Sequence, residues 1–278
     1  MRVLGITIYP VKSTGGLTLQ RAEVQRWGLC GDRRWAVVDS SGAKVTARTH
    51  PGLLRVSATP VAGGGIAVHA AGMGAPLAIA APSDSGDPMP VAFSQLDHAV
   101  SAGAAGDAWF SELLGEPVRL VWLDDPERRA VAARHGGRPG EVVSLADAAP
   151  LLMTTQASLH QLDRWVAEEA RARGERAPDP LVMARFRPNL VVDGEAPFAE
   201  DDYAEVRVGE LRFRVASGCD RCVMTTVDPV TLRRGKEPIR TLARRRSGDG
   251  KVWFGVRLVP VEPGTIQVGD AVTALSAE

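Results

Sequence analysis

The sequence predicts an α+β fold dominated by strands, with two closely packed β-barrel-like sub-domains and a few helices. Most apolar segments are short, rich in β-branched residues and bounded by glycine or proline turns. Only two segments show the apolar period of an amphipathic helix. The chain has 278 residues, enough for two modest domains, and its most loop-like composition begins at residue 124. We therefore predict one domain over residues 1–123 and a second over residues 124–278.

The first third of the chain consists of short strand patterns separated by glycine-containing turns, which favours a barrel or a sandwich. The segment 61–82 is apolar, but five glycines interrupt it, so it is interpreted as strands and turns and not as a membrane span. The predicted strands before this segment are residues 2–9, 17–24, 35–39, 44–47 and 54–59.

A short helix is predicted over residues 107–114. Asp107 can accept hydrogen bonds at its N-terminus, and Gly115 follows at the position where helices often end in a left-handed conformation. Trp109 and Phe110 belong to its apolar stripe. A strand over residues 118–122 follows and completes the first domain.

The second domain is predicted to contain one long helix, residues 155–173, whose apolar face packs in the core. Residues 205–215 alternate apolar and charged side chains on either side of Gly209-Glu210, which predicts an antiparallel hairpin with one solvated face. Residues 252–259 and 271–275 supply closing strands.

Composition excludes several functional classes. Lys plus Arg and Asp plus Glu both number 33, so no global field favours nucleic acid or an acidic membrane. The basic runs 233–236 and 244–246 lack interleaved aromatic residues and are interpreted as solvated surface. No phosphate-binding loop, dinucleotide fingerprint or hydrolase nucleophile elbow is present. Three cysteines are too few for a secreted disulfide scaffold, so a reducing, cytoplasmic location is expected.

The segment 217–229 is the main candidate for chemistry because it places Asp220 and Arg221 between Cys219 and Cys222. A structural zinc site normally has four Cys or His ligands, and the histidines are scattered singly. A redox dithiol favours a helix N-terminus, whereas this pair leaves a strand and enters residues 223–227, which look β-like. A single thiolate that binds a soft, high-valent metal is a third use, and an inert buried pair is the fourth reading.

Positively charged side chains supply candidate anion sites. Lys12 and Ser13 precede Gly15-Gly16, and such a loop can offer an ammonium and backbone N–H groups to a phosphate. Arg33 lies at the opening of a strand, where an ordinary surface ion pair is the alternative. Pro188 fixes the backbone between Arg187 and Asn189, which suggests positioned polar groups or a simple strand entry.

Seven segments occur in the order found in MOSC-domain proteins with a β-barrel N-terminal half. This group contains the mitochondrial amidoxime-reducing component and its bacterial relatives, and the resemblance covers nearly the whole chain. The segments are Ile8-Tyr-Pro-Val-Lys-Ser13, Gly31-Asp-Arg-Arg-Trp35, Val45-Thr-Ala-Arg48, Arg185-Phe-Arg-Pro-Asn189, Cys219-Asp-Arg-Cys-Val-Met-Thr-Thr-Val-Asp-Pro229, Lys236-Glu-Pro238 and Pro263-Gly-Thr-Ile-Gln-Val-Gly-Asp270.

The resemblance implies a molybdenum cofactor, in which a molybdopterin with a terminal phosphate holds the metal together with one protein cysteine. The family's ligand position corresponds to Cys222. A looser match assigns Asp147 as a catalytic residue near the metal. The positions that match cofactor contacts are Lys12, Ser13, Arg33, Arg187, Asn189, Asp220 and Arg221.

The resemblance also implies the reaction, namely reduction of N-hydroxylated compounds such as amidoximes and hydroxylamines by oxygen-atom transfer at the cysteine-bound molybdenum. Two electrons and two protons complete the cycle. Some relatives carry a C-terminal ferredoxin domain whose cysteines have no counterpart here, so a separate flavin, haem or iron–sulfur protein is expected to donate the electrons. No membrane partner is expected. The alternatives are a non-catalytic cofactor carrier or sulfur-transfer protein, and a dithiol oxidoreductase. The loop 231–235 departs from the family pattern, and Cys30 matches no family role.

Overall fold

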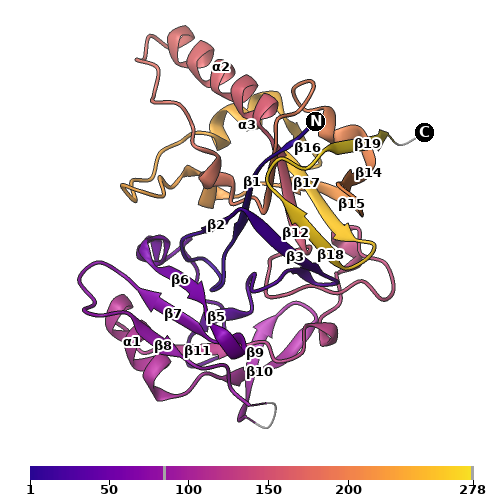
Figure 1. The fold of residues 1–278 in the computed structure, drawn as a ribbon. Helices are drawn as coiled ribbons and strands as arrows, with labels where there is room; N and C mark the ends of the chain where they lie inside the picture. Colours follow the sequence, from indigo (N-terminus) through magenta and orange to yellow (C-terminus); the bar gives the residue numbers. More distant parts are fainter. Residues whose placement is uncertain (84–85, 277–278) are drawn as a thin grey trace. The chain divides into compact units, whose positions relative to one another are not determined.

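The computed structural model describes residues 1–83 and 86–276 (Figure 1). Contacts between residues divide the chain into two compact units. Unit 1 contains Met1–Thr7, Leu19–Gln25 and Leu151–Glu278, and unit 2 contains Ile8–Thr18 and Arg26–Pro150. The chain passes from unit 2 into unit 1 within β2 (Leu17–Leu19). The predicted domain boundary between residues 123 and 124 concerns sequence modules and stays a prediction.

Unit 1 is built on a large sheet. Its hydrogen-bonded order is β19 (Val272–Ser276), β14 (Tyr203–Val208), β15 (Leu211–Asp220), β17 (Lys251–Pro260), β12 (Leu151–Thr155), β13 (Leu190–Val192) and β1 (Val3–Ile8), with β16 (Ser247–Gly248) added to β17. β12 and β13 run parallel, whereas β14, β15 and β17 are antiparallel neighbours. A separate antiparallel pair joins β3 (Arg21–Gln25) to β18 (Gly264–Gln267).

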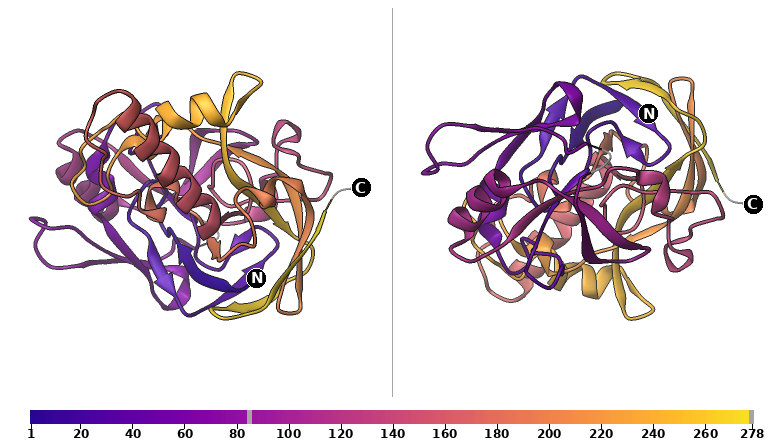
Figure 2. Two further views of the ribbon diagram at one scale, coloured as in Figure 1. Left: turned by 90° about the horizontal axis from the view of Figure 1, so that it is seen from above. Right: turned by 90° about the horizontal axis from the view of Figure 1, so that it is seen from below.

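The helices of unit 1 share one apolar core. α2 (Gln156–Ala172) contributes Leu159, Leu162 and Val166, and α3 (Ile239–Arg245) contributes Leu242. Phe186, in the 3-10 helix η5 (Met183–Phe186), stacks on Phe254 of β17 with ring centroids 4.0 Å apart. Figure 2 shows α2 and α3 close together within this unit. The core therefore fixes η5 against the sheet strand that also pairs with β15.

Unit 2 contains two small antiparallel sheets. One has the order β5 (Trp35–Val38), β11 (Arg119–Trp122), β10 (Leu96–Ser101) and β9 (Pro88–Phe93). The other has the order β6 (Ser57–Pro60), β7 (Ile66–His69) and β8 (Leu77–Ile79). The remaining elements are β4 (Gly28–Leu29), α1 (Ala104–Leu114) and the 3-10 helices η1 (Pro51–Arg55), η2 (Ala62–Gly64), η3 (Pro126–Arg128) and η4 (Ala133–His135). Its core combines Ala36 and Val38 of β5 with Phe93 and Leu96, and it extends to Leu145.

The α+β fold dominated by strands is confirmed, and so are several local predictions. The long helix begins after Thr155, whose side chain accepts a hydrogen bond from the N–H of Ser158, and it extends to Ala172. The hairpin of β14 and β15 pairs Glu205 with Arg214, as the alternation of charged and apolar residues predicted. Gly115 ends α1 in the left-handed conformation. Within the described ranges, no helix combines the length and apolar character needed to cross a membrane.

Other local predictions are wrong. α1 begins at Ala104 after Gly103, so Asp107 does not cap it; its carboxylate instead accepts the N–H of Leu120 at 2.8 Å. Residues 44–47 do not form a strand, since only Lys44 makes an isolated bridge, to Val38 of β5. At Asp107 a hydrogen bond from a neighbouring strand replaced the predicted cap, and after Lys44 the chain leaves β5 and enters a turn at residue 47.

Two further segments differ from the predicted strands. Leu54 belongs to the 3-10 helix η1, and the strand β6 begins only at Ser57. The predicted strand 17–24 is broken at Gln20 into β2 and β3, which belong to different sheets. Short apolar runs do not by themselves distinguish a strand from a turn of 3-10 helix.

Candidate functional site

Lys12 of unit 2 is a buried cation held by two oxygen atoms. Its Nζ donates to the backbone oxygen of Leu145 at 2.9 Å and to Oδ1 of Asp147 at 2.5 Å. Burial lowers the pKa of Lys12 to about 8, although Asp147 opposes this shift. Lys12 in turn holds the pKa of Asp147 well below its usual range. The Asp147 side chain is 62% exposed, so the pair presents a charged carboxylate to solvent over a buried ammonium.

Ser13 and Arg33 both adopt the left-handed backbone conformation, with φ of 71° and 48°. Non-glycine residues seldom occupy this region, and such positions cluster at binding sites. Arg33 donates from Nη1 to Oδ2 of Asp32 at 2.6 Å, and its guanidinium lies 4.4 Å from the centroid of the Tyr9 ring. The buried Asp32 also accepts the N–H of Tyr9 at 2.8 Å, which fixes the turn that carries Arg33.

Two further arginines of unit 2 join this cluster. Arg48 lies with Nη2 3.3 Å from Oδ2 of Asp147. Arg129 is buried and donates from Nη1 to the backbone oxygens of Ser144 and Ala146, the residue before Asp147. Burial lowers the pKa of Arg129 to about 10. The sequence interpretation missed Arg129 because the loop-like composition around it gave no sign that its side chain is buried.

Cys222 of unit 1 lies just beyond β15 and is exposed. It precedes the 3-10 helix η7 (Val223–Thr226), and its backbone oxygen accepts the N–H of Thr225 at 3.1 Å and the hydroxyl of Thr225 at 3.0 Å. The prediction that residues 223–227 are β-like is wrong for residues 223–226, because Thr225 closes a tight turn by bonding back to Cys222, whereas Val227 forms an antiparallel bridge with Arg234. This turn holds the exposed thiol at the end of the strand.

Asp220 is fixed by an arginine from the neighbouring strand. Arg257 of β17 is buried and donates to the Oγ of Ser217 at 3.2 Å, to the backbone oxygen of Gly218 at 2.8 Å and to Oδ1 of Asp220. The register between β15 and β17 shifts twice over this stretch, as in β-bulges. Although partial burial opposes the shift, Arg257 lowers the pKa of Asp220. One side chain therefore holds the irregular end of β15 that leads to Cys222.

Arg221 connects this segment to η5. It donates from Nη2 to the backbone oxygen of Phe186 at 2.7 Å and from Nη1 to the Sγ of Cys219 at 2.9 Å. Arg187 follows Phe186 and adopts the left-handed conformation with φ of 55°. The structure therefore brings Asp220, Arg221 and Cys222 to the same part of unit 1 as the turn that carries Arg187.

Asn189 is buried just before β13, and its side chain forms hydrogen bonds with β12 and β1. Its Oδ1 accepts the N–H of Leu152 at 3.2 Å, and its Nδ2 donates to the backbone oxygen of Thr7 at 3.1 Å. These bonds link β12 and β1 beside β13. The structure accounts for Asn189 as a residue that fixes the sheet, and its contact with a cofactor stays a prediction.

The predicted site residues form two groups. In unit 2, Lys12 and Asp147 are in contact, and Ser13 is next to Lys12 in the chain. In unit 1, Asp220, Arg221 and Cys222 are consecutive, and Arg221 contacts the residue before Arg187. The prediction that the cations of unit 2 and Cys222 meet at one cofactor stays a prediction.

Comparisons with known proteins cover nearly the whole chain. The model of the MOSC N-terminal beta barrel domain matches residues 1–117, and the model of the MOSC domain matches residues 140–273. Mitochondrial amidoxime-reducing component 1 of Homo sapiens is 32% identical over 98% of this chain and 82% of its own. Molybdenum cofactor sulfurase of Danio rerio is 31% identical over 90% of this chain, which spans 31% of that relative.

Among solved structures, the YuaD protein of Bacillus subtilis aligns over 100% of this chain and 96% of its own at 11% identity, with a TM-score of 0.43. The two domain models and the sequence relatives agree with the order of motifs in the sequence. The chain belongs to the family of MOSC-domain proteins that carry a MOSC N-terminal β-barrel domain.

Proposed function

We propose that this protein is a molybdenum cofactor-dependent reductase of N-hydroxylated compounds such as amidoximes and hydroxylamines. The observation that carries the proposal is the exposed thiol of Cys222 within a chain that is 32% identical, over 98% of its length, to an amidoxime-reducing component. The sparse use of cysteine supports a reducing, cytoplasmic setting.

The residues present fit such a cofactor. Cys222 is exposed at a fixed turn and offers the soft sulfur donor that a high-valent molybdenum takes. Arg33 offers a guanidinium to a terminal phosphate, in a protein with no net charge to attract one, whereas the Lys12 ammonium is buried and paired with Asp147. Ser13 and Arg33 have strained backbones, as residues at binding sites often do. Bound cofactor would supply the redox and oxygen-transfer chemistry, for which protein side chains are not equipped.

The chain's own residues would bind the cofactor, orient the substrate and hydrogen-bond its N–OH group. An amidoxime R–C(NH2)=NOH takes up two electrons and two protons and gives the amidine R–C(NH2)=NH and water. Lys12 keeps Asp147 ionised, so its exposed carboxylate can accept a hydrogen bond from the N–OH group, but at neutral pH it neither donates a proton nor is basic enough to remove one. Arg221 and Arg257 would hold the Cys222 segment in place through their bonds to Phe186 and Asp220.

A second candidate function is a carrier of molybdenum cofactor or a protein that transfers sulfur to it. The relatives named molybdenum cofactor sulfurase favour this reading, although the chain spans only about a third of their length. A carrier would bind the cofactor through the same residues and catalyse no reduction.

Two measurements distinguish the reductase from the carrier. One is turnover of benzamidoxime with chemically reduced methyl viologen, and the other is the molybdenum content of the purified protein. We expect close to one molybdenum per chain and formation of benzamidine. Cys222→Ser is expected to lose the metal and the activity, whereas Cys30→Ser, which changes another exposed cysteine, is expected to keep both.

Other outcomes identify the alternatives. Molybdenum bound without benzamidine formation would indicate the carrier. Equal molybdenum in the wild-type protein and Cys222→Ser would contradict both cofactor proposals. The dithiol reading predicts complete loss of activity in Cys219→Ser, whereas the molybdenum reading predicts partial survival, because Cys219 is buried and is not the ligand.

A further inference from the structure

A short hairpin, residues 227–236, follows η7 directly and is here called the basic hairpin. Val227 and Arg234 form an antiparallel bridge. The N–H of Asp228 donates to the backbone oxygen of Arg233 at 2.9 Å, and the N–H of Gly235 donates to that of Thr226 at 2.9 Å. The basic hairpin is therefore hydrogen-bonded to the same turn that begins at Cys222.

Asp228 also fixes the basic hairpin, both within its own turn and against η5. The Asp228 carboxylate accepts the N–H groups of Val230 and Thr231 at 3.0 and 2.8 Å, and it pairs with Arg185 of η5 at 2.7 Å. These contacts tie the tip of the hairpin to η5. The segment is thus a defined surface beside the Cys222 turn.

The cations of the basic hairpin face solvent. Arg233, Arg234 and Lys236 are all exposed. The side chains of Arg233 and Lys236 make no ion pair or hydrogen bond with any residue in the ranges 1–83 and 86–276. Unpaired, closely spaced cations on a protein with no net charge produce a local positive potential.

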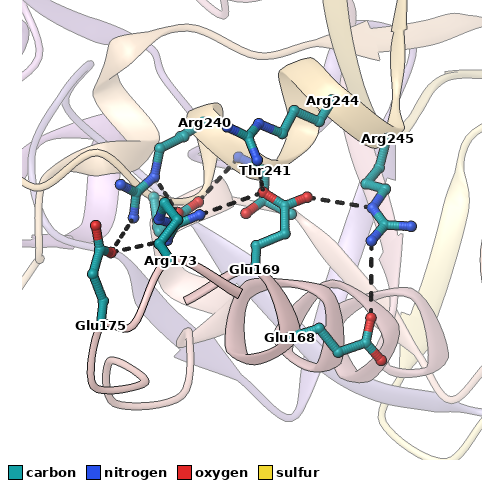
Figure 3. A network of polar contacts seen from close by, with 9 residues as sticks. Glu168, Glu169, Arg173, Glu175, Arg240, Thr241, Arg244 and Arg245 are labelled. Atoms are coloured by element: carbon teal, nitrogen blue, oxygen red, sulfur yellow. Dashed lines mark hydrogen bonds and ion pairs between the residues drawn. The ribbon is translucent and has the colours of Figure 1, made fainter. Parts of the chain in front are cut away.

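The next arginines along the chain behave differently. Those of α3 pair with carboxylates of α2 and its C-terminal loop, as Figure 3 shows. Arg245 lies 3.3 Å from Glu169, Arg244 lies 3.5 Å from the same residue, and Arg240 lies 3.3 Å from Glu175. These cations are used within the protein, whereas Arg233 and Lys236 of the basic hairpin remain available to a partner.

Apolar side chains accompany these cations. Val230 at the hairpin tip is 77% exposed, and Val223, next to Cys222, is 44% exposed. The two exposed valines beside exposed cations give this surface the mixture of apolar and charged groups found at protein interfaces.

We propose that the basic hairpin, with Val223 and Val230, is the docking surface for the electron-donor protein, and that the donor presents an acidic face around its redox group. This inference rests on the proposed function, because only a reductase needs a donor. The donor, a reduced flavin, haem or iron–sulfur protein, gives up two electrons for each N–O bond cleaved, and solvent supplies the two protons. A positive surface next to the metal ligand would steer such a donor to the place where electrons enter.

Binding to an oxidised bacterial flavodoxin, used as a small acidic redox probe, tests the surface without any turnover. The variant Arg233→Glu/Lys236→Glu reverses the two unpaired charges. Arg21→Glu/Arg171→Glu is the matched control, because Arg21 on β3 and Arg171 on α2 are exposed and carry the same charge. At low ionic strength we expect the Kd of the hairpin variant to rise about tenfold or more, with the control close to wild type. Added salt should weaken flavodoxin binding more in the wild type than in the hairpin variant, because the variant has lost the charges that salt screens.

Two outcomes of the binding experiment would overturn the inference. One is that the wild type does not bind flavodoxin at low ionic strength. The other is that the hairpin variant and the control have equal Kd values.

A kinetic experiment tests the same surface. With reduced flavodoxin as donor, kcat/KM for the donor should fall in the hairpin variant, while benzamidoxime reduction by methyl viologen stays unchanged. A raised KM for benzamidoxime with methyl viologen would assign the cations to substrate instead. Absence of benzamidoxime reduction in the wild type would contradict the proposed reductase and with it the need for a donor, whereas equal Kd values in the presence of that activity would contradict the docking surface alone.

Discussion

The guanidinium of Arg221 lies with Nη1 2.9 Å from the Sγ of Cys219. Cys219 is 8% exposed, whereas Cys222, three positions later, is exposed. Two cysteines that look equivalent in the sequence are therefore in different environments, one enclosed and engaged by a cation and the other open to solvent.

The cysteines should differ in reactivity. With iodoacetamide, Cys222 is expected to be alkylated at least about ten times faster than Cys219, because access limits the reaction of a buried thiol. Peptide mass spectrometry over time measures both rates. Arg221→Ala should accelerate alkylation of Cys219 and leave that of Cys30, in unit 2, unchanged. Equal rates at Cys219 and Cys222 in the wild type would contradict the described burial.

Asp147→Asn should destabilise protein produced without molybdenum, by about 1–2 kcal/mol at pH 7, because it removes the carboxylate that faces the buried ammonium of Lys12. The range is below that of a fully buried pair, since Asp147 is open to water. Urea unfolding measures the change. Glu112→Gln, which changes an exposed carboxylate of α1, is the control and should alter stability little.

The pH dependence of that variant follows from Lys12. Its pKa is lowered from 10.5 to about 8 by burial, so folding favours the neutral amine, and the contribution of Lys12 to wild-type stability increases as the pH rises from about 8 to 10.5. Above this pKa the ammonium is lost and Asp147 has less positive charge to balance. The difference in free energy of unfolding between wild type and Asp147→Asn should therefore be smaller at about pH 10 than at pH 7. A difference that grows with pH would contradict the pairing.

Arg257→Met should cost about 2 kcal/mol in the free energy of unfolding, because it leaves the Asp220 carboxylate and the Gly218 carbonyl without their donor. The end of β15 should also loosen, which hydrogen exchange at residues 217–222 detects. Arg212→Met, which changes a half-exposed arginine of the same sheet, is the control. Unchanged exchange at residues 217–222 would show that Arg257 does not position the Cys222 segment.

Glu169→Gln should destabilise unit 1 by about 1–3 kcal/mol, because one buried carboxylate serves Arg173, Arg244 and Arg245. Thermal unfolding of Glu169→Gln, Arg245→Ala and the double variant measures the coupling. The effects should not add, since both changes remove the same contact. Glu168→Gln, at the exposed end of the network in Figure 3, should change stability little.

Local sequence patterns were enough for the class of fold and for several elements. Apolar alternation around Gly209 indicated the hairpin of β14 and β15, and the helical period together with Thr155 indicated α2. Such signals act over a few residues, where backbone geometry and hydrogen bonding depend on close neighbours. They failed at Asp107, because the N–H of Leu120, thirteen residues away, uses its carboxylate.

The sequence by itself determined the family and the residue types of the candidate site, because motif order and side-chain chemistry are both written in the chain. Only the tertiary structure decided how those side chains are used. The contact of Lys12 with Asp147 joins residues 135 positions apart, and that of Arg257 with Asp220 joins residues 37 positions apart. Burial, the pKa of Lys12 and the difference between Cys219 and Cys222 arise from such contacts, since they depend on what surrounds a group in space and not on its neighbours in the chain.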